Sequence, residues 1–135
     1  METHYQLNDR EFERSFENGS YSHPFTHEAH LRLAWIHVVK YGELKAIEHI
    51  VAQLHNYVQK VGAEDKYHHT VTVAAIKAVH HFIRRSKEQT FEGFIAEFPR
   101  LKTQFRQLLN SHYSLDVFNS SLARKTYLEP DLAPF

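Results

Sequence analysis

The chain has 135 residues, of which 42% are hydrophobic and 24% charged, a composition typical of one soluble globular domain. Lysine plus arginine equals aspartate plus glutamate at 16 each, so no global charge would attract nucleic acid or an anionic membrane, and we expect neither as a partner. The absence of cysteine excludes disulfides, thiolate nucleophiles, iron–sulfur clusters and thiolate zinc sites.

The N-terminal residues lack the basic and apolar regions of a signal peptide, and no apolar run approaches the length that crosses a bilayer. We therefore expect a cytoplasmic protein. The composition has one anomaly, which is its twelve histidines. Several of them look peripheral, because His4 lies in the N-terminal tail and His80 and His81 fall on sides of a helix that face away from its apolar residues.

The first expected helix begins with a capping box, in which Asn8 is the N-cap and Glu11 reaches back to it. Thr26 is expected to cap a second helix, which runs to about Tyr41 and ends at Gly42. Apolar residues occupy so much of the circumference of this second helix that it should be largely buried at the centre of the fold.

Three more helical segments follow in the sequence. Residues 44–61 have the 3–4 spacing of an amphipathic helix, and Asp65 is expected to cap a helix that runs to about Ser86. Thr90 opens another helix, which Pro99 either kinks or divides into two segments.

These patterns predict an all-α fold, because no convincing alternating strand is longer than four residues. We expect one domain over residues 1–135, a bundle of four main antiparallel helices with short helices at its ends. A short helix and connector occupy residues 1–24, and the bundle core occupies residues 26–110. Residues 111–135 contain a short helix and a tail that packs on the body.

Two histidine-containing stretches carry the predicted site. His27 and His30 lie about 60° apart on one apolar helix face, because each helical residue turns the chain by about 100°. His68 lies on the apolar side of a later helix. Three imidazoles directed into one bundle interior, with a fourth position open, would resemble a catalytic metal site.

Zinc, nickel, iron and manganese are all compatible with three imidazole ligands. Tyr67, Thr70, Thr72 and Arg124 are the candidates for contacting a substrate or orienting the ligands, and His37 is a candidate fourth ligand or orienting group. The sequence predicts a small cytoplasmic metal-binding protein. If the protein is a metal-dependent enzyme, it acts on a small molecule in the histidine-lined pocket. The sequence does not decide whether it is an enzyme.

A metal-free alternative fits the same residues. His27 would cap a helix start, and His30 and His68 would be neutral core imidazoles bonded to carbonyls or hydroxyls. An aromatic pocket would then bind a small molecule, with histidines and Arg124 at its polar end. Arg124 also has a structural interpretation, an ion pair with Asp131 that pins the tail.

Other classes of function find little support. HExxH, Gly-rich phosphate loops and GxSxG are all missing, which argues against the enzymes that carry them. An apolar surface on the region 91–109 would instead predict a homo-oligomer interface.

The histidine stretches and the C-terminal segment form one longer pattern: Phe25-x-His27-x-x-His30-Leu31, Lys66-Tyr67-His68-x-Thr70-x-Thr72, Tyr113-Ser114, then Ser121, Ala123 and Arg124, and finally Pro130-Asp131-Leu132. This pattern resembles that of a family of small, mostly bacterial, all-helical proteins with no assigned activity. The resemblance implies that these stretches and the tail belong to one site. An acidic residue often follows the histidine of the second stretch in that family, whereas this chain has His69 there.

Overall fold

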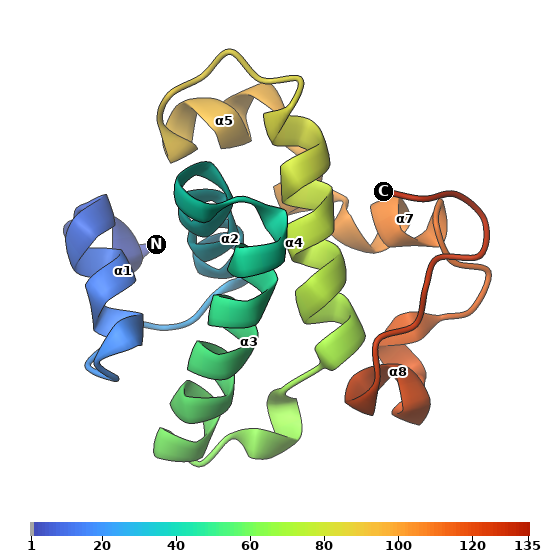
Figure 1. Cartoon of the computed structure of the whole chain (residues 1–135), viewed down its shortest axis with the longest axis horizontal. Coiled ribbons are helices and arrows are strands. Elements are labelled where there is room, and N and C mark those ends of the chain that lie inside the picture. Colours follow the sequence, from blue (N-terminus) through green and yellow to red (C-terminus); the bar gives the residue numbers. More distant parts are fainter. Residues whose placement is uncertain (1) are drawn as a thin grey trace.

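The computed structural model describes residues 2–135, and these residues contain helices and no strand (Figure 1). The predicted all-α class is confirmed. None of the described helices has the length and apolar character needed to cross a membrane. In chain order the helices, with 3-10 turns marked η, are η1 (Thr3–Gln6), α1 (Asp9–Glu17), α2 (His27–Tyr41), α3 (Glu43–Lys60), η2 (Glu64–Lys66), α4 (His69–Ile83), α5 (Phe91–Glu97), α6 (Arg100–Thr103), α7 (Phe105–Asn110), η3 (Val117–Asn119) and α8 (Ser121–Lys125).

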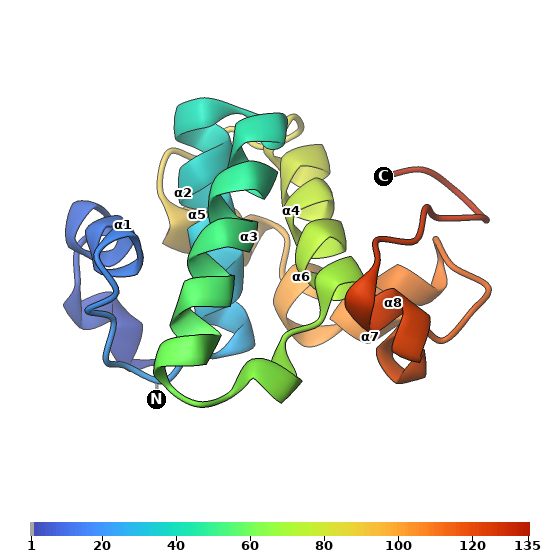
Figure 2. The same cartoon turned by 60° about the horizontal axis from the view of Figure 1, so that its bottom comes forward.

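Helices α2, α3 and α4 lie side by side at the centre, with α1 on one side and α7, α8 and the C-terminal segment on the other (Figures 1 and 2). As expected, α2 is largely buried, and every residue from Leu31 to Val38 is inside the fold. Gly42 alone separates α2 from α3. Its φ of 86° is a backbone conformation that glycine adopts without a Cβ clash, which allows the tight reversal.

Helix α3 runs antiparallel to both of its neighbours. Phe25, just before α2, packs on Tyr57 near the end of α3, with ring centroids 5.6 Å apart. Glu43, at the start of α3, pairs with His80 near the end of α4, where Oε2 and Nδ1 lie 2.7 Å apart. Helices α2 and α4 therefore both begin at the end of the bundle where α3 finishes.

The caps predicted at Asn8, Thr26 and Thr90 are present, because each side chain accepts a hydrogen bond from a first-turn amide. The predicted start of α4 is wrong. Residues 64–66 form a separate 3-10 turn, and the imidazole of His68 caps α4 by accepting from the Val71 amide.

The arrangement of four main antiparallel helices is not confirmed. Helices α2, α3 and α4 have 15, 18 and 15 residues, whereas the later helices have seven or fewer. Region 91–110 is divided by Pro99 and Gln104 into three short helices. Most of its apolar residues line the core, and the oligomer interface expected there stays a prediction: Phe91, Phe94, Leu101, Phe105, Leu108 and Leu109 are all buried.

The C-terminal segment lies against α4 and the residues after α7. The hydroxyl of Thr70 donates to the carbonyl of Thr126 over 2.7 Å and accepts from the amide of Leu128 over 3.1 Å. The Tyr113 hydroxyl donates to the Leu128 carbonyl over 2.7 Å. These bonds hold residues 126–128 on the body of the protein.

Candidate functional site

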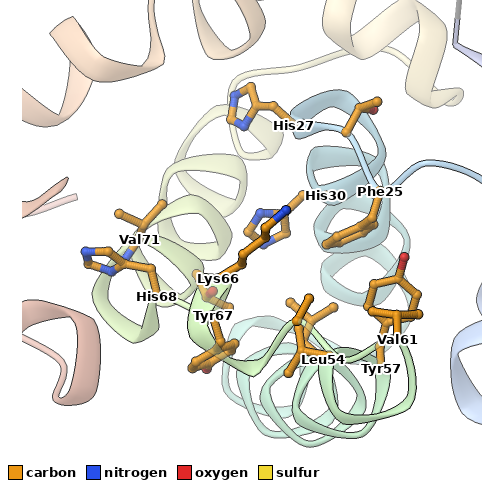
Figure 3. Close-up of a pocket in the computed structure, with 14 residues that line it drawn as sticks. Phe25, His27, His30, Leu54, Tyr57, Val61, Lys66, Tyr67, His68 and Val71 are labelled. Atoms are coloured by element: carbon orange, nitrogen blue, oxygen red, sulfur yellow. The ribbon is translucent and has the colours of Figure 1, made fainter.

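A cavity of about 530 Å³ lies at the end of the bundle where α3 ends and α2 and α4 begin (Figure 3). Three parts of the chain form its walls: the start of α2 with the residues before it, the last turns of α3, and the segment from residue 63 into the first turn of α4. The lining residues are Phe25, Thr26, His27, His30, Leu54, Tyr57, Val58, Val61, Ala63, Lys66, Tyr67, His68, Val71 and Thr72.

His30 supplies the unsatisfied polar group of the cavity. Its ring is directed into the space between α2, α3 and α4 (Figure 3), where it packs against Phe25 with ring centroids 5.7 Å apart. Its Nε2 atom is buried and has no hydrogen-bond partner among residues 2–135. Burial lowers the pKa of His30 to about 3, so the ring is neutral at pH 7 and offers one donor and one acceptor.

His27 lines the same cavity but is tied to a different part of the chain. Its Nε2 lies 2.8 Å from the carbonyl oxygen of Leu101. A carbonyl only accepts, so Nε2 carries the ring proton and Nδ1 keeps its lone pair. The ring also packs on Phe105, with centroids 4.8 Å apart.

Both ring nitrogens of His68 are already engaged. Nε2 donates to the carbonyl of Val117 over 2.7 Å, and Nδ1 accepts from the amide of Val71 over 3.2 Å. Burial lowers the pKa of His68, which keeps the ring neutral in these two bonds. The ring is directed away from the centre of the cavity (Figure 3).

These contacts bear on the predicted metal site. His27, His30 and His68 all line one cavity, yet their nitrogens do not form a close ligand group. Among the residues that the structure describes, the one group of three metal-ligating side chains whose ligand atoms lie within 4.8 Å of one another is elsewhere in the fold. The three-histidine metal site therefore stays a prediction without a matching cluster of ligand atoms.

Of the residues expected to support the site, Tyr67 and Thr72 line the cavity. The Tyr67 hydroxyl lies 2.8 Å from Nδ1 of His69, and its ring packs on His55 with centroids 4.3 Å apart. Burial raises the pKa of Tyr67 to about 12, so the phenol is neutral at pH 7. Thr70 does not line the cavity, because its hydroxyl binds the C-terminal segment.

Arg124 also lies outside the cavity. Its Nη1 donates to the carbonyls of Asp65 and Tyr67 over 2.8 and 3.4 Å, so it holds the turn that precedes α4. The expected ion pair with Asp131 is absent. The Asp131 carboxylate instead accepts from the amide and hydroxyl of Ser114, which hold its pKa below the usual range.

His37 is not a member of this site. It is 1% exposed and lies between α2 and α3, where its ring centroid is 5.4 Å from that of Tyr41 and 5.5 Å from that of His49. Neither of its ring nitrogens has a hydrogen-bond partner among residues 2–135. The helical spacing placed it on the correct face of α2 but too far along the helix to reach the cavity.

The close ligand group is Glu2, His4 and Glu28, which the sequence did not indicate. His4, expected to be peripheral, is 1% exposed. Arg32 Nη1 lies 3.2 Å from His4 Nδ1, and a guanidinium only donates, so the ring proton is on Nε2, 3.2 Å from Glu2 Oε1. Lys102 neutralises Glu28 over 2.6 Å. The group is therefore a partly buried set of ion-pair contacts, in which His4 Nε2 lies near the Glu2 carboxylate but has no hydrogen-bond partner among residues 2–135.

Lys66 is a further lining residue that the sequence did not identify as part of the site. Its exposed side chain lines the cavity and overlaps His30 in the view of Figure 3. No carboxylate within the described chain pairs with its ammonium group. The one available signal was its position immediately before Tyr67 in the second histidine stretch.

Comparisons with protein-family models, with curated proteins and with solved structures found no match for this chain. The resemblance to a family of small bacterial helical proteins therefore stays a prediction. The geometry of the cavity carries the functional proposal.

Proposed function

We propose that this chain binds a small, largely apolar molecule in the cavity between the start of α2, the end of α3 and the start of α4, without a metal ion. The observation that carries the proposal is the buried, unpartnered Nε2 of His30 in a cavity whose walls include Phe25, Leu54 and Val71 beside its polar residues. A buried polar atom without a partner costs about 1–3 kcal/mol, which a ligand with one hydrogen-bonding group would recover. The cavity volume of about 530 Å³ falls in the range of small-molecule sites.

The bonds of His68 favour binding without a metal. To ligate an ion, this imidazole would have to release the Val117 carbonyl or the Val71 amide. Releasing the amide would also uncap α4, at a cost of about 1 kcal/mol. His27 has its Nδ1 lone pair available, but one such lone pair beside the His30 ring does not make a three-ligand site.

The chemistry of the lining favours binding over acid–base catalysis. A general base works best when its pKa is near the working pH, and burial places the pKa of His30 at about 3. No aspartate or glutamate lines the cavity, so no carboxylate is available to orient or activate the imidazole. We therefore propose a binding protein. The cytoplasmic location and the homo-oligomeric state expected from the sequence stay predictions.

A neutral fluorescent probe, N-phenyl-1-naphthylamine, tests this function. We expect its emission to rise on binding, and we expect Val61→Trp to abolish the rise because Val61 lines the cavity and is 51% exposed, so the larger ring can enter the space without disturbing the core. Leu44→Trp is the matched control, because Leu44 is 80% exposed at the far end of α3.

The outcome that contradicts the proposal is no binding by the parent protein, or equal binding by the Val61→Trp and Leu44→Trp variants. Thermal unfolding with Zn²⁺ or Ni²⁺ gives a second check. We expect neither ion to raise the midpoint of the parent protein relative to a His30→Phe variant. A metal-dependent rise that this variant loses would favour the metal site instead.

A further inference from the structure

The cavity has a one-sided distribution of charge. Its lining contains one lysine, three neutral or weakly basic imidazoles and no carboxylate. Glu64 and Asp65, the acidic residues nearest to Lys66 in the sequence, are exposed on η2 and do not line the cavity. The ammonium group of Lys66 therefore has no counter-charge inside the site.

The N-terminus of α4 adds to this positive potential. Helices α2 and α4 each have 15 residues and both begin at the cavity, where Thr26 and His68 are their caps. The positive end of a helix dipole favours an anion nearby. The start of α2 already has one, because the Glu2 carboxylate accepts from the Thr26 hydroxyl over 2.6 Å, whereas the first turn of α4 has no acidic residue. Helix α3 ends there with the opposite polarity, but it contributes mainly apolar side chains, Leu54, Tyr57, Val58 and Val61.

We propose that the ligand is a small carboxylic acid with an apolar body, whose carboxylate lies at Lys66 and the start of α4. The apolar body would lie against Phe25, Leu54, Tyr57 and Val71. The free Nε2 of His30 would hydrogen-bond a polar group of the ligand. This inference rests on the proposed function, because it names the class of molecule that the same cavity binds.

Three probes with one shared tail test the inference: 4-phenylbutyrate, 4-phenylbutan-1-ol and 4-phenylbutylamine, each titrated by calorimetry. We expect the acid to bind more tightly than the alcohol, and the amine to bind at least about tenfold more weakly than the acid, because a cation would face Lys66 and the positive end of α4. Lys66→Gln should weaken the acid about threefold to tenfold and leave the alcohol unchanged.

Lys45→Gln is the matched control, because Lys45 is an exposed lysine in the first turn of α3, at the opposite end of that helix from the cavity. We expect this variant to bind all three probes as the parent does. An acid and an amine of equal affinity, or a Lys66→Gln variant that binds the acid as the parent does, would overturn the choice of ligand class.

The two proposals fail in different ways. If the neutral alcohol and N-phenyl-1-naphthylamine bind and Val61→Trp blocks them while charge has no effect, the cavity binds ligands but does not select acids. If no probe binds the parent protein, the proposed function itself is wrong. Binding of the acid that is retained in Val61→Trp would place the acid outside the cavity and would overturn the inference.

Discussion

The side chain of His68 joins the start of α4 to the C-terminal third of the chain: Nε2 donates to the Val117 carbonyl over 2.7 Å, while Nδ1 accepts from the Val71 amide over 3.2 Å. We expect His68→Ala to lower the free energy of unfolding by about 1–3 kcal/mol, because both the helix cap and the bond to η3 are lost. Urea unfolding measures this loss.

His68→Asn separates the two contributions. Asparagine is a strong N-cap residue but is too short to reach Val117, so its stability should lie between those of the parent and His68→Ala. If His68→Ala is as stable as the parent, the imidazole is not the structural link described here.

Arg32 is the buried anchor of the N-terminal segment. Although it is 3% exposed, its guanidinium donates to the Asp9 carboxylate over 2.9 Å and to the carbonyls of His4 and Leu7 over 2.8 Å. We expect Arg32→Met to cost about 3 kcal/mol or more in urea unfolding, because it strands the partners of the guanidinium.

Arg32→Lys should recover little of that loss, because an ammonium group cannot reproduce the fork of donors. Arg10→Met, at an exposed position in α1, should stay within about 0.5 kcal/mol of the parent. A fully stable Arg32→Lys variant would show that charge alone holds the segment. Limited proteolysis near residues 2–9 detects whether the N-terminal segment has detached from the body of the protein.

Thr70 is predicted to act through the C-terminal segment and not through a ligand. Thr70→Val keeps the shape of the side chain but removes the hydroxyl that bonds both Thr126 and Leu128, so we expect a loss of about 1–3 kcal/mol. Hydrogen exchange at the Leu128 amide should accelerate. Thr103→Val, at an exposed position in α6, is the control. Unchanged hydrogen exchange at the Leu128 amide in Thr70→Val would contradict the proposed role of the Thr70 hydroxyl in holding the C-terminal segment.

His37 predicts a loss of stability in acid. Burial is the main cause that lowers its pKa to about 4; Glu13 opposes the shift, and His49 and Lys40 add to it. An unfolded histidine has a pKa of about 6.5. Between about pH 4 and pH 6.5, the unfolded chain binds a proton at this histidine that the folded chain does not bind. The stabilisation of the fold by the neutral ring is therefore complete above about pH 6.5 and is lost as the pH falls towards 4.

Between pH 7 and pH 5 this one histidine accounts for a loss of about 2 kcal/mol in unfolding free energy. The phenyl ring of the His37→Phe variant cannot take up a proton. The unfolding free energy of this variant, measured in urea, should therefore fall by about 2 kcal/mol less than that of the parent over the same pH interval. His55→Phe, at an exposed position in α3, is the comparison. Equal pH dependence in the parent and His37→Phe would show that His37 is not buried in its neutral form.

Sequence reasoning succeeded where structure is decided locally. The caps at Asn8, Thr26 and Thr90 depend on a side chain and an amide three residues apart, so they can be identified from neighbouring residues alone. The cap of α4 was missed because its N-cap acceptor is an imidazole, whereas N-cap acceptors are usually carboxylates, amides or hydroxyls. Asp65 has such a side chain and was therefore predicted instead.

The candidate site shows the complementary limit. Helical spacing predicted that His27, His30 and His68 face the interior, and all three line one cavity. Which of their nitrogens is free depends on the carbonyls of Leu101 and Val117, and no spacing rule places those backbone atoms. The burial of His4 was missed for the same reason, since it follows from the path of the N-terminal segment around Arg32.

Arg124 grips the backbone on either side of Lys66, yet helix α8 contributes nothing to the cavity wall. Helix α8 thus fixes the position of a lining residue without lining the cavity itself. Deleting residues 121–135 would leave every lining residue in the polypeptide but would remove the two hydrogen bonds that fix the backbone beside Lys66. Affinity measured on a C-terminally shortened protein would consequently describe a different binding site.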